Sequence, residues 1–257
     1  MRILLPLLIA LLVACTSAPP PPNAPLRDPV NVPGQRYDDY DPHGWEGRSP
    51  AAYSVYGIDV ARFQGGINWN KVAGDGVSFA FMKATEGGDL LDPTYKTNRV
   101  GARRAGLRTA AYHFYYFCRP AVDQAKWFIK NVPRGAHDLP PVLDLEWNPF
   151  SPTCTRRPDG AVVRAETRVF LDMLEAHYGK RPIIYTSIDF YRDTGIGQLR
   201  GTDFWLRSVA AHPSKRYPGQ KWAFWQFTGT GAVDGVVGPV DINVFSGTAS
   251  QFATWRK

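Results

Sequence analysis

The segment from Pro141 to Trp147 reads PVLDLEW and combines a short apolar run with two carboxylates. Valine and leucine behind two prolines are typical of a buried strand, because branched apolar side chains suit a covered, pleated surface. Residues two apart in a strand share a face and lie roughly 6–7 Å apart along it, so Asp144 and Glu146 point the same way. Two acids on one face of a buried strand repel each other and lose hydration. We therefore expect either a partner that neutralises them or a site that uses them.

Short apolar runs alternate with helical patterns on both sides of this segment. The predicted strands are 56–63, 78–85, 108–117, 141–147, 181–187, 203–210, 222–229 and 239–247, and the predicted helices are 92–106, 121–132 and 160–179. Alternation of strand and helix indicates a parallel sheet, and eight strands in one domain indicate closure into a barrel. The expected fold class is α/β, with one irregular TIM-like barrel over residues 53–257 that lacks some outer helices in its last third.

Four acidic side chains are expected at one end of this barrel. In such folds, functional groups gather at the carboxyl ends of the strands. Asp59 lies late in the first predicted strand, Asp144 and Glu146 end the fourth, and Asp241 lies in the last. A single aspartate in a strand is more often a turn or capping residue, but four that converge on one mouth indicate a functional site.

Clustered carboxylates support acid–base chemistry, because each ionised neighbour raises the pKa of the next. One member is then protonated near neutral pH and can act as a general acid, while an ionised neighbour stabilises a developing positive centre. This division of labour is that of glycoside hydrolysis. Aromatic rings on which sugars can stack lie nearby in the sequence; about half of them are assigned to the core, and Tyr112, Tyr185 and Trp147 to the cleft.

The same acids could instead hold Mg²⁺ or Ca²⁺ in a metal-dependent hydrolase, since hard cations take oxygen ligands. Against this alternative, the five histidines are dispersed and no phosphate-binding glycine-rich loop accompanies the acids. His113 alone lies on a predicted strand and is expected to be a hydrogen-bonded residue of the core or behind the site. No G-x-S-x-G motif and no defensible Cys–His pair is present. We expect no metal and no cofactor.

The N-terminus has the features of an export signal. Residues 1–14 contain Arg2 and an apolar run too short to span a bilayer comfortably. The sequence LVAC that ends at Cys15 resembles the lipobox of bacterial lipoproteins, which predicts cleavage before Cys15 and its lipidation; a plain secretion signal is the alternative. Residues 15–52 are rich in proline and are expected to form a semi-rigid tether. The predicted location is the cell envelope, as a lipoprotein held to a membrane only by its lipid, or otherwise the periplasm or the exterior.

Two further cysteines, Cys118 and Cys154, follow predicted strands in adjacent connecting loops. In an exported protein such a pair favours a disulfide, with two reduced, buried thiols as the alternative. Their spacing is not that of a metal site.

The formal net charge of +7 suits an anionic polymer such as cell wall, nucleic acid or a membrane surface. The basic residues are scattered, however, and no nucleic-acid-binding motif is present, so no nucleic-acid partner is expected.

Five segments of the chain resemble, in the correct order, the signature segments of the glycoside hydrolase family 25 lysozymes. They are YGIDVARFQGGINW (56–69), FAFMKATEG (79–87), AGLRTAAYHF (105–114), PVLDLEW (141–147) and FWQFTGTGAVDGVVGPVDINVF (224–245). The resemblance covers about residues 56–250. It implies a (β/α)5(β)3 barrel with five helices, acting as an N-acetylmuramidase on the β-1,4 bond between N-acetylmuramic acid and N-acetylglucosamine in peptidoglycan.

The resemblance also implies roles for individual residues. Glu146 matches the general acid/base, and Asp144 matches the acid that orients the substrate's own 2-acetamido group as it attacks the anomeric carbon. Asp59 and Asp241 match supporting acids, and Gln226 matches a position beside the cleft. Retaining hydrolysis with substrate assistance is expected, although the spacing of the two acids does not by itself decide between retention and inversion.

The chain departs from the family pattern at two places. Residues 61–63 read ARF where serine and Trp or Tyr are common, and Asn68 stands where aspartate is frequent. Neither change touches the four acids, so the expected activity stands. The two changes bear on the fine specificity. A catalytically idle peptidoglycan-binding lipoprotein is the alternative function, disfavoured because a binder has no use for repelling acids. Glycan strands are the expected partner of a monomer, whether for remodelling of the cell's own wall, phage-type lysis or attack on competitors.

Overall fold

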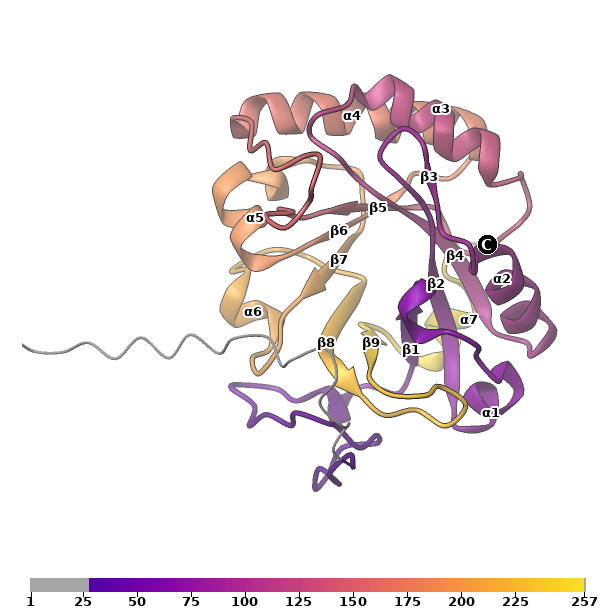
Figure 1. Cartoon of the computed structure of the whole chain (residues 1–257). Helices are drawn as coiled ribbons and strands as arrows, with labels where there is room; N and C mark the ends of the chain where they lie inside the picture. The colour runs from indigo at the N-terminus through magenta and orange to yellow at the C-terminus, as the bar shows by residue number, and fades with distance from the viewer. Residues whose placement is uncertain (1–27, 257) are drawn as a thin grey trace, which may run out of the picture.

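The computed structural model describes residues 28–256 and contains a closed barrel (Figure 1). Its strands are β1 (Tyr56–Val60), β2 (Val77–Glu86), β3 (Leu90–Leu91), β4 (Arg108–Phe114), β5 (Val142–Leu145), β6 (Ile183–Thr186), β7 (Phe204–Arg207), β8 (Phe224–Gly231) and β9 (Val240–Phe245). The sheet order is β1-β9-β8-β7-β6-β5-β4-β2-β3, and an additional pairing of β1 with β2 closes the ring. Since β3 only adds two residues to the edge of β2, the barrel itself has eight strands, as predicted.

Helices cover the outside of the barrel, with α3 and α4 lying side by side across the top of Figure 1. They are α1 (Trp69–Gly74), α2 (Tyr95–Arg104), α3 (Ala121–Asn131), α4 (Gly160–Tyr178), α5 (Ile188–Thr194), α6 (Pro213–Arg216) and α7 (Ala249–Thr254). The first five helices each follow one of the first five barrel strands, which agrees with the expected (β/α)5(β)3 pattern. Two short helices, α6 after β7 and α7 after β9, are present in addition to the five expected. In the part of the chain that the structure describes, no helix is long and apolar enough to cross a membrane.

The short helices α1 and α5 are absent from the sequence-based assignment because their six and seven residues are too few for a clear apolar period. The first of them also explains one departure from the family pattern. The side chain of Asn68 accepts a hydrogen bond of 3.2 Å from the backbone N–H of Lys71 and so caps the start of α1. Asparagine and aspartate serve almost equally well at this position of a helix.

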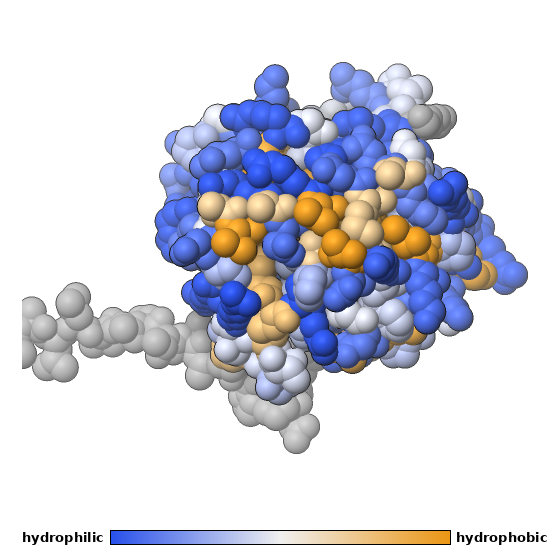
Figure 2. All heavy atoms as spheres, turned by 90° about the horizontal axis from the view of Figure 1, so that it is seen from above, coloured by the Kyte–Doolittle hydropathy of each residue, from blue (hydrophilic) through white to orange (hydrophobic). Residues whose placement is uncertain are grey.

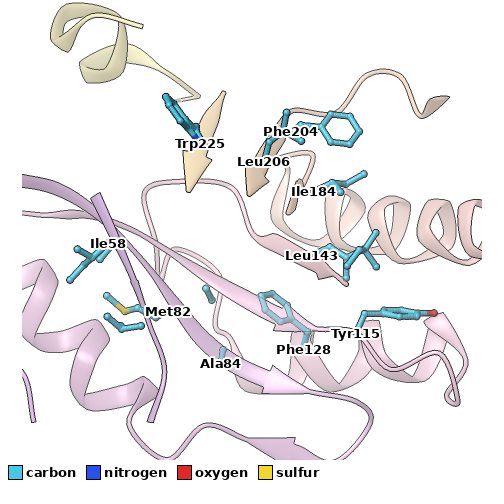
Figure 3. Packing of buried hydrophobic residues seen from close by; sticks show 14 of the residues in the cluster. Ile58, Met82, Ala84, Tyr115, Phe128, Leu143, Ile184, Phe204, Leu206 and Trp225 are labelled. Carbon is cyan, nitrogen blue, oxygen red and sulfur yellow. The ribbon is translucent and has the colours of Figure 1, made fainter. Parts of the chain in front are cut away.

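Two apolar layers follow from strand alternation. One fills the barrel with side chains such as Phe79, Phe81, Val142 and Trp205. The other lies between barrel and helices; Figure 3 shows part of it, with Leu143 and Ile184 of neighbouring strands and Phe128 of α3. Because β5 places Val142 inward and Leu143 outward, Asp144 must again face the barrel interior.

The last strand runs in the opposite direction from the one expected. β9 is antiparallel to both β8 and β1, because an eight-residue connection from β8 is enough for a hairpin but not for a parallel crossover. Asp241 is therefore the second residue of its strand rather than near the end. The reversal brings the start of β9 to the mouth at which the other strands end, and Asp241 pairs in register with Asp59.

The tether prediction is wrong for residues 28–52, which pack against the barrel. Asp39 is buried and accepts hydrogen bonds from the hydroxyls of Thr228 and Thr230. Tyr37 packs edge-on against Tyr56, with ring centroids 5.4 Å apart. A composition rich in proline does not prevent a segment from docking when a few aromatic and polar residues find partners. The rest of the predicted tether, the signal segment and Cys15 lie outside the described residues.

The face covered by α3 and α4 is mainly hydrophilic, with apolar side chains in an interrupted band (Figure 2). Exposed valines of these helices include Val122, Val162 and Val169, each no more than half exposed. Apolar atoms scattered over a helical surface in this way are normal for a folded domain.

Cys118 and Cys154 form the predicted disulfide, with their Cα atoms 5.7 Å apart. The bond joins the loops that follow β4 and β5 across a sequence separation of 36 residues. We expect a Cys118→Ser/Cys154→Ser protein to lose roughly 3–4 kcal/mol of unfolding free energy, because the open chain gains entropy when unfolded. Urea unfolding of the two proteins measures this difference, and reductant should reproduce it in the unsubstituted protein. Equal midpoints would contradict the prediction.

Candidate active site

The mouth of the barrel holds a cavity of about 270 Å³ whose walls are rich in carboxylates. Its lining consists of Asp59, Val60, Ala61, Phe63, Gln64, Lys83, Tyr112, Phe114, Asp144, Glu146, Tyr185, Trp205, Arg207, Gln226 and Asp241. All four acids singled out in the sequence are in this set, and they come from β1, β5 and β9 or the residue just beyond. The convergence of these acids on one mouth is therefore observed, while their catalytic roles remain predictions.

Of the two acids at the end of β5, Asp144 is more deeply buried than Glu146. Its side chain is buried, and its Oδ1 atom has no hydrogen-bond partner among residues 28–256. Burial raises the pKa of Asp144 well above its ordinary value, and the neighbouring Glu146 raises it further. A buried carboxylate oxygen without a donor is costly, so this atom is available for a donor on a bound molecule.

Glu146 lies one residue beyond the end of β5 and is half-buried. Burial raises its pKa to about 7, with Asp189 and Asp59 adding to the shift and Arg207 opposing it. The side chain can therefore hold a proton at neutral pH, unlike an ordinary glutamic acid. The carboxyl can donate that proton to a basic atom in the cavity.

Asp59 is held by a chain of hydrogen bonds. Its carboxylate accepts from the Nε2 atom of Gln226 at 3.0 Å and from the Nδ2 atom of Asn243 at 2.8 Å. The hydroxyl of Tyr185 donates to Oε1 of Gln226 at 2.9 Å, which fixes the orientation of that amide. Burial still raises the pKa of Asp59 to about 6, although both amide donors and Arg207 favour the ionised form.

Asp241 faces Asp59 across the β1–β9 pair and is partly buried. Burial raises the pKa of Asp241 well above its usual range, and the charge of Asp59 adds to this effect. Ionisation of one of these two acids therefore disfavours ionisation of the other, as expected for a coupled cluster.

Three of the four residues predicted to contact substrate line the cavity. Tyr112, Tyr185 and Gln226 face it, whereas Trp147 packs against Phe117 and Phe190 in the outer apolar layer. The prediction for Trp147 is wrong because strand alternation, which places Asp144 and Glu146 inward, turns the next residue outward. Its indole N–H donates to Asp193 of α5 at 3.0 Å.

His113 is a core residue, in agreement with the sequence-based expectation. Its ring lies 2.7 Å from the hydroxyl of Thr85 and 3.1 Å from Oε1 of Gln124, so both nitrogens have partners. Burial lowers its pKa to about 4, which keeps the ring neutral in the folded protein.

Several cavity residues were missed from the sequence: Phe63, Lys83, Phe114 and Arg207, together with Asn243 behind Asp59. Alternation alone would have found most of them. Lys83 continues the inward series of Phe79 and Phe81, and Arg207 lies two residues beyond the inward Trp205. A polar residue that continues an inward apolar series at the end of a barrel strand therefore predicts a side chain of the cavity.

Between residues 28 and 256, no group of three or more His, Cys, Asp or Glu side chains is arranged to hold a metal ion. In the cavity, the four acids instead share the space with the cationic side chains of Lys83 and Arg207.

Comparison with known families agrees with the sequence resemblance and with this geometry. The sequence profile described as Glycosyl hydrolases family 25 matches residues 58–236. This range contains three of the four acids, and Asp241 lies just beyond it. The chain belongs to glycosyl hydrolase family 25. It is therefore a glycoside hydrolase, as predicted.

Relatives of this family 25 hydrolase match over most of its length. Lysozyme M1 of Streptomyces globisporus is 34% identical, over 95% of this chain and 90% of that protein. The protein YegX of Escherichia coli K12 is 38% identical, over 79% of this chain and 74% of that protein. The structure of a family 25 glycosyl hydrolase from Bacillus anthracis superposes with a TM-score of 0.75 at 34% identity, covering 82% of this chain and 97% of that one.

Proposed function

We propose that this family 25 hydrolase is an N-acetylmuramidase, a lysozyme that hydrolyses the β-1,4 bond between N-acetylmuramic acid and N-acetylglucosamine in peptidoglycan. The observation that carries the proposal is the placement of two acids at the end of β5 in one cavity: the half-buried Glu146, and the buried Asp144, whose Oδ1 atom has no hydrogen-bond partner among residues 28–256. The names of its relatives support the substrate: besides Lysozyme M1 they include an N,O-diacetylmuramidase of Arthroderma benhamiae and an autolytic lysozyme of Clostridium acetobutylicum.

In the proposed mechanism, Glu146 is the general acid and base. Its protonated carboxyl donates a proton to the glycosidic oxygen as the bond to the anomeric carbon breaks. The resulting carboxylate then removes a proton from the water that completes hydrolysis. A pKa of about 7 suits both tasks, because neither protonation state is strongly disfavoured at neutral pH.

Asp144 is proposed to assist the substrate's own nucleophile. The 2-acetamido group of the muramic acid attacks the anomeric carbon through its carbonyl oxygen, and its N–H donates to the unpartnered Oδ1 of Asp144. In its ionised form, Asp144 also stabilises the positive charge that spreads over the acetamido group. Water then opens the cyclic intermediate from the opposite face, so the product retains its anomeric configuration.

Asp59 and Asp241 are proposed to keep a proton in the cluster and to contact substrate. Asp59 is anchored by Gln226 and Asn243, and its charge raises the pKa of Glu146. Removing that charge is expected to lower the pKa of Glu146 and thus the supply of protonated acid at neutral pH.

Purified peptidoglycan digested with the protein should release muropeptides whose reducing ends are muramic acid, detectable by mass spectrometry after borohydride reduction. Release should persist after treatment with a chelator, since the proposed steps use only side chains of this chain. Reducing ends at N-acetylglucosamine would contradict the assigned bond. Binding to cell walls without release would favour the idle wall-binding alternative, and activity lost to the chelator would favour the metal-dependent one.

The activity is expected to fall as the pH rises above about 7. Glu146 must be protonated to act, and its protonated fraction drops about tenfold per pH unit above its pKa. Measuring kcat/KM on solubilised peptidoglycan between pH 4 and 9 tests this. A rate that keeps rising through pH 8 would be incompatible with Glu146 as the general acid.

We further propose that the protein is an exported, monomeric lipoprotein attached through Cys15. The sequence LVAC before residue 16 and the wall-directed activity support this location. Metabolic labelling with palmitate should mark the full-length protein but not a Cys15→Ala variant, and equal labelling would remove the proposal. Light scattering of the soluble domain measures its oligomeric state.

A further inference from the structure

The two cations that line the cleft differ in their partners. Lys83 forms an ion pair with Glu86, and its ammonium lies 4.7 Å from the centre of the Phe114 ring. Among the ion pairs and hydrogen bonds of residues 28–256, none involves the guanidinium of Arg207. Arg207 ends β7, and its side chain is exposed into the cavity.

The backbone of Arg207 is anchored, and its guanidinium lies near the acids of the cavity. Its backbone carbonyl accepts a 2.6 Å hydrogen bond from the buried Tyr217. A Cβ atom at Gly229 would lie 3.9 Å from Nη2 of Arg207 and 3.2 Å from Oδ1 of Asp241, so both groups lie beside this glycine. The guanidinium thus lies close to the acids, and its charge lowers the pKa of Asp59, Glu146 and Asp241 without bonding any of them.

This arrangement is suited to an anionic group brought in by a ligand. A guanidinium presents its N–H donors in a planar fork that matches a carboxylate in two parallel hydrogen bonds. A cleft with four acids would repel an anion, and a free cation at its wall offsets that repulsion locally. A neutral sugar polymer would offer these donors only hydroxyl and amide oxygens, without the negative charge and the paired oxygens of a carboxylate.

We propose that Arg207 binds a carboxylate of the substrate and thereby makes the enzyme selective for glycan strands that carry this group. The inference rests on the proposed function. N-acetylmuramic acid differs from N-acetylglucosamine by a lactyl ether, whose carboxyl group is free on strands without peptide and amide-linked on strands that carry stem peptides. Stem peptides have carboxylates of their own, so the anionic group comes either from the lactyl ether or from the peptide.

A purely electrostatic role for Arg207 makes a different prediction. If Arg207 only lowers the pKa values of the acids, replacing it shifts the pH optimum and changes the rate on every substrate by the same factor. Binding of a carboxylate instead changes KM, and only for substrates that carry the group.

Three substrates separate these cases: peptide-bearing peptidoglycan, strands stripped of peptide by an amidase, and the same stripped strands with their carboxylates converted to methylamides. The variants are Arg207→Gln and Arg207→Lys. Arg200→Gln is the matched control, because Arg200 is exposed outside the cleft and, within the part of the chain that the structure describes, bonds only the carbonyl of Gly197. Each protein is assayed at its own pH optimum, so that a common shift in the acids cancels in the ratios between substrates.

We expect the unsubstituted enzyme to prefer the carboxylate-bearing strands about tenfold to a hundredfold in kcat/KM, mainly through KM. Arg207→Gln should abolish this preference, Arg207→Lys should keep part of it, and Arg200→Gln should keep all of it. A preference for stripped strands over their methylamides identifies the lactyl carboxylate. If Arg207→Gln loses activity only on peptide-bearing peptidoglycan, the bound group is a carboxylate of the peptide.

An equal factor on all three substrates in Arg207→Gln would overturn the inference and leave the proposed function intact. Absence of muramic acid reducing ends from every substrate with the unsubstituted enzyme would overturn both. The two failures are therefore distinguishable in one set of assays.

Discussion

Replacing Glu146 with glutamine is expected to lower kcat on purified peptidoglycan by a factor of about 10²–10⁴ or to abolish turnover, because general acid–base catalysis contributes on this scale. Glutamine has nearly the same shape as glutamic acid but no acidic proton to give to the leaving oxygen. The half-buried position of Glu146 beyond the end of β5 accepts an amide, so the fold should be unchanged. Turnover is measured by release of reducing ends, and the fold by circular dichroism.

The matched control is Glu175→Gln, which makes the same chemical change on the outer surface of α4. Glu175 accepts a hydrogen bond from Arg181 at 2.8 Å and lies outside the cleft. This variant should retain full activity. A fully active Glu146→Gln protein would refute the assignment of the general acid, whatever the behaviour of the control.

Replacing Asp144 with asparagine is expected to lower kcat by about 10²–10³, the range seen when one electrostatic contact to a transition state is removed. The amide has no negative charge to stabilise the positive charge on the attacking acetamido group.

The Asp144→Asn variant should also have a larger free energy of unfolding than the unsubstituted protein at pH 7. Burial raises the pKa of Asp144, so its ionisation is disfavoured in the folded state and lowers stability as the pH rises.

Peptidoglycan whose 2-acetamido groups have been converted to free amines separates two roles for Asp144. If it assists the acetamido group, the unsubstituted enzyme should fail on this substrate, and Asp144→Asn should add little further loss. If Asp144 were itself the nucleophile, the deacetylated substrate would still be cleaved and the variant would lose that activity. Asp172→Asn, on the exposed face of α4 next to Arg181, serves as the control and should match the unsubstituted enzyme in both assays.

Much of the active site was accessible from local sequence, because a strand has a period of two residues. That period places Asp144 and Glu146 on one inward face at the end of β5, and it likewise places Lys83 of β2 and Arg207 of β7 toward the barrel interior. The same period turns Trp147 outward, although an aromatic ring beside two acids is typical of a sugar-binding cleft. The same principle thus accounts for both the correct predictions and the error.

Other features depended on contacts between distant segments. Composition predicted a detached tether up to residue 52, yet Asp39 finds two threonines of β8 about 190 positions away. The hydrogen bonds that hold Asp59 come from Gln226 and Asn243, and nothing in the first strand indicates these partners. Hydrogen bonding between such segments is set by the closure of the barrel.

By itself, the sequence determined which residues face the barrel interior and which segments form its main strands, because alternation and apolar periodicity are local properties of the chain. The tertiary structure decided how those residues act together. Reversal of β9 brings Asp241 opposite Asp59, and burial at the mouth raises the pKa of Glu146 to about 7. Both effects arise from neighbours far apart in the chain, since desolvation and charge coupling depend on distance in space rather than on spacing in sequence.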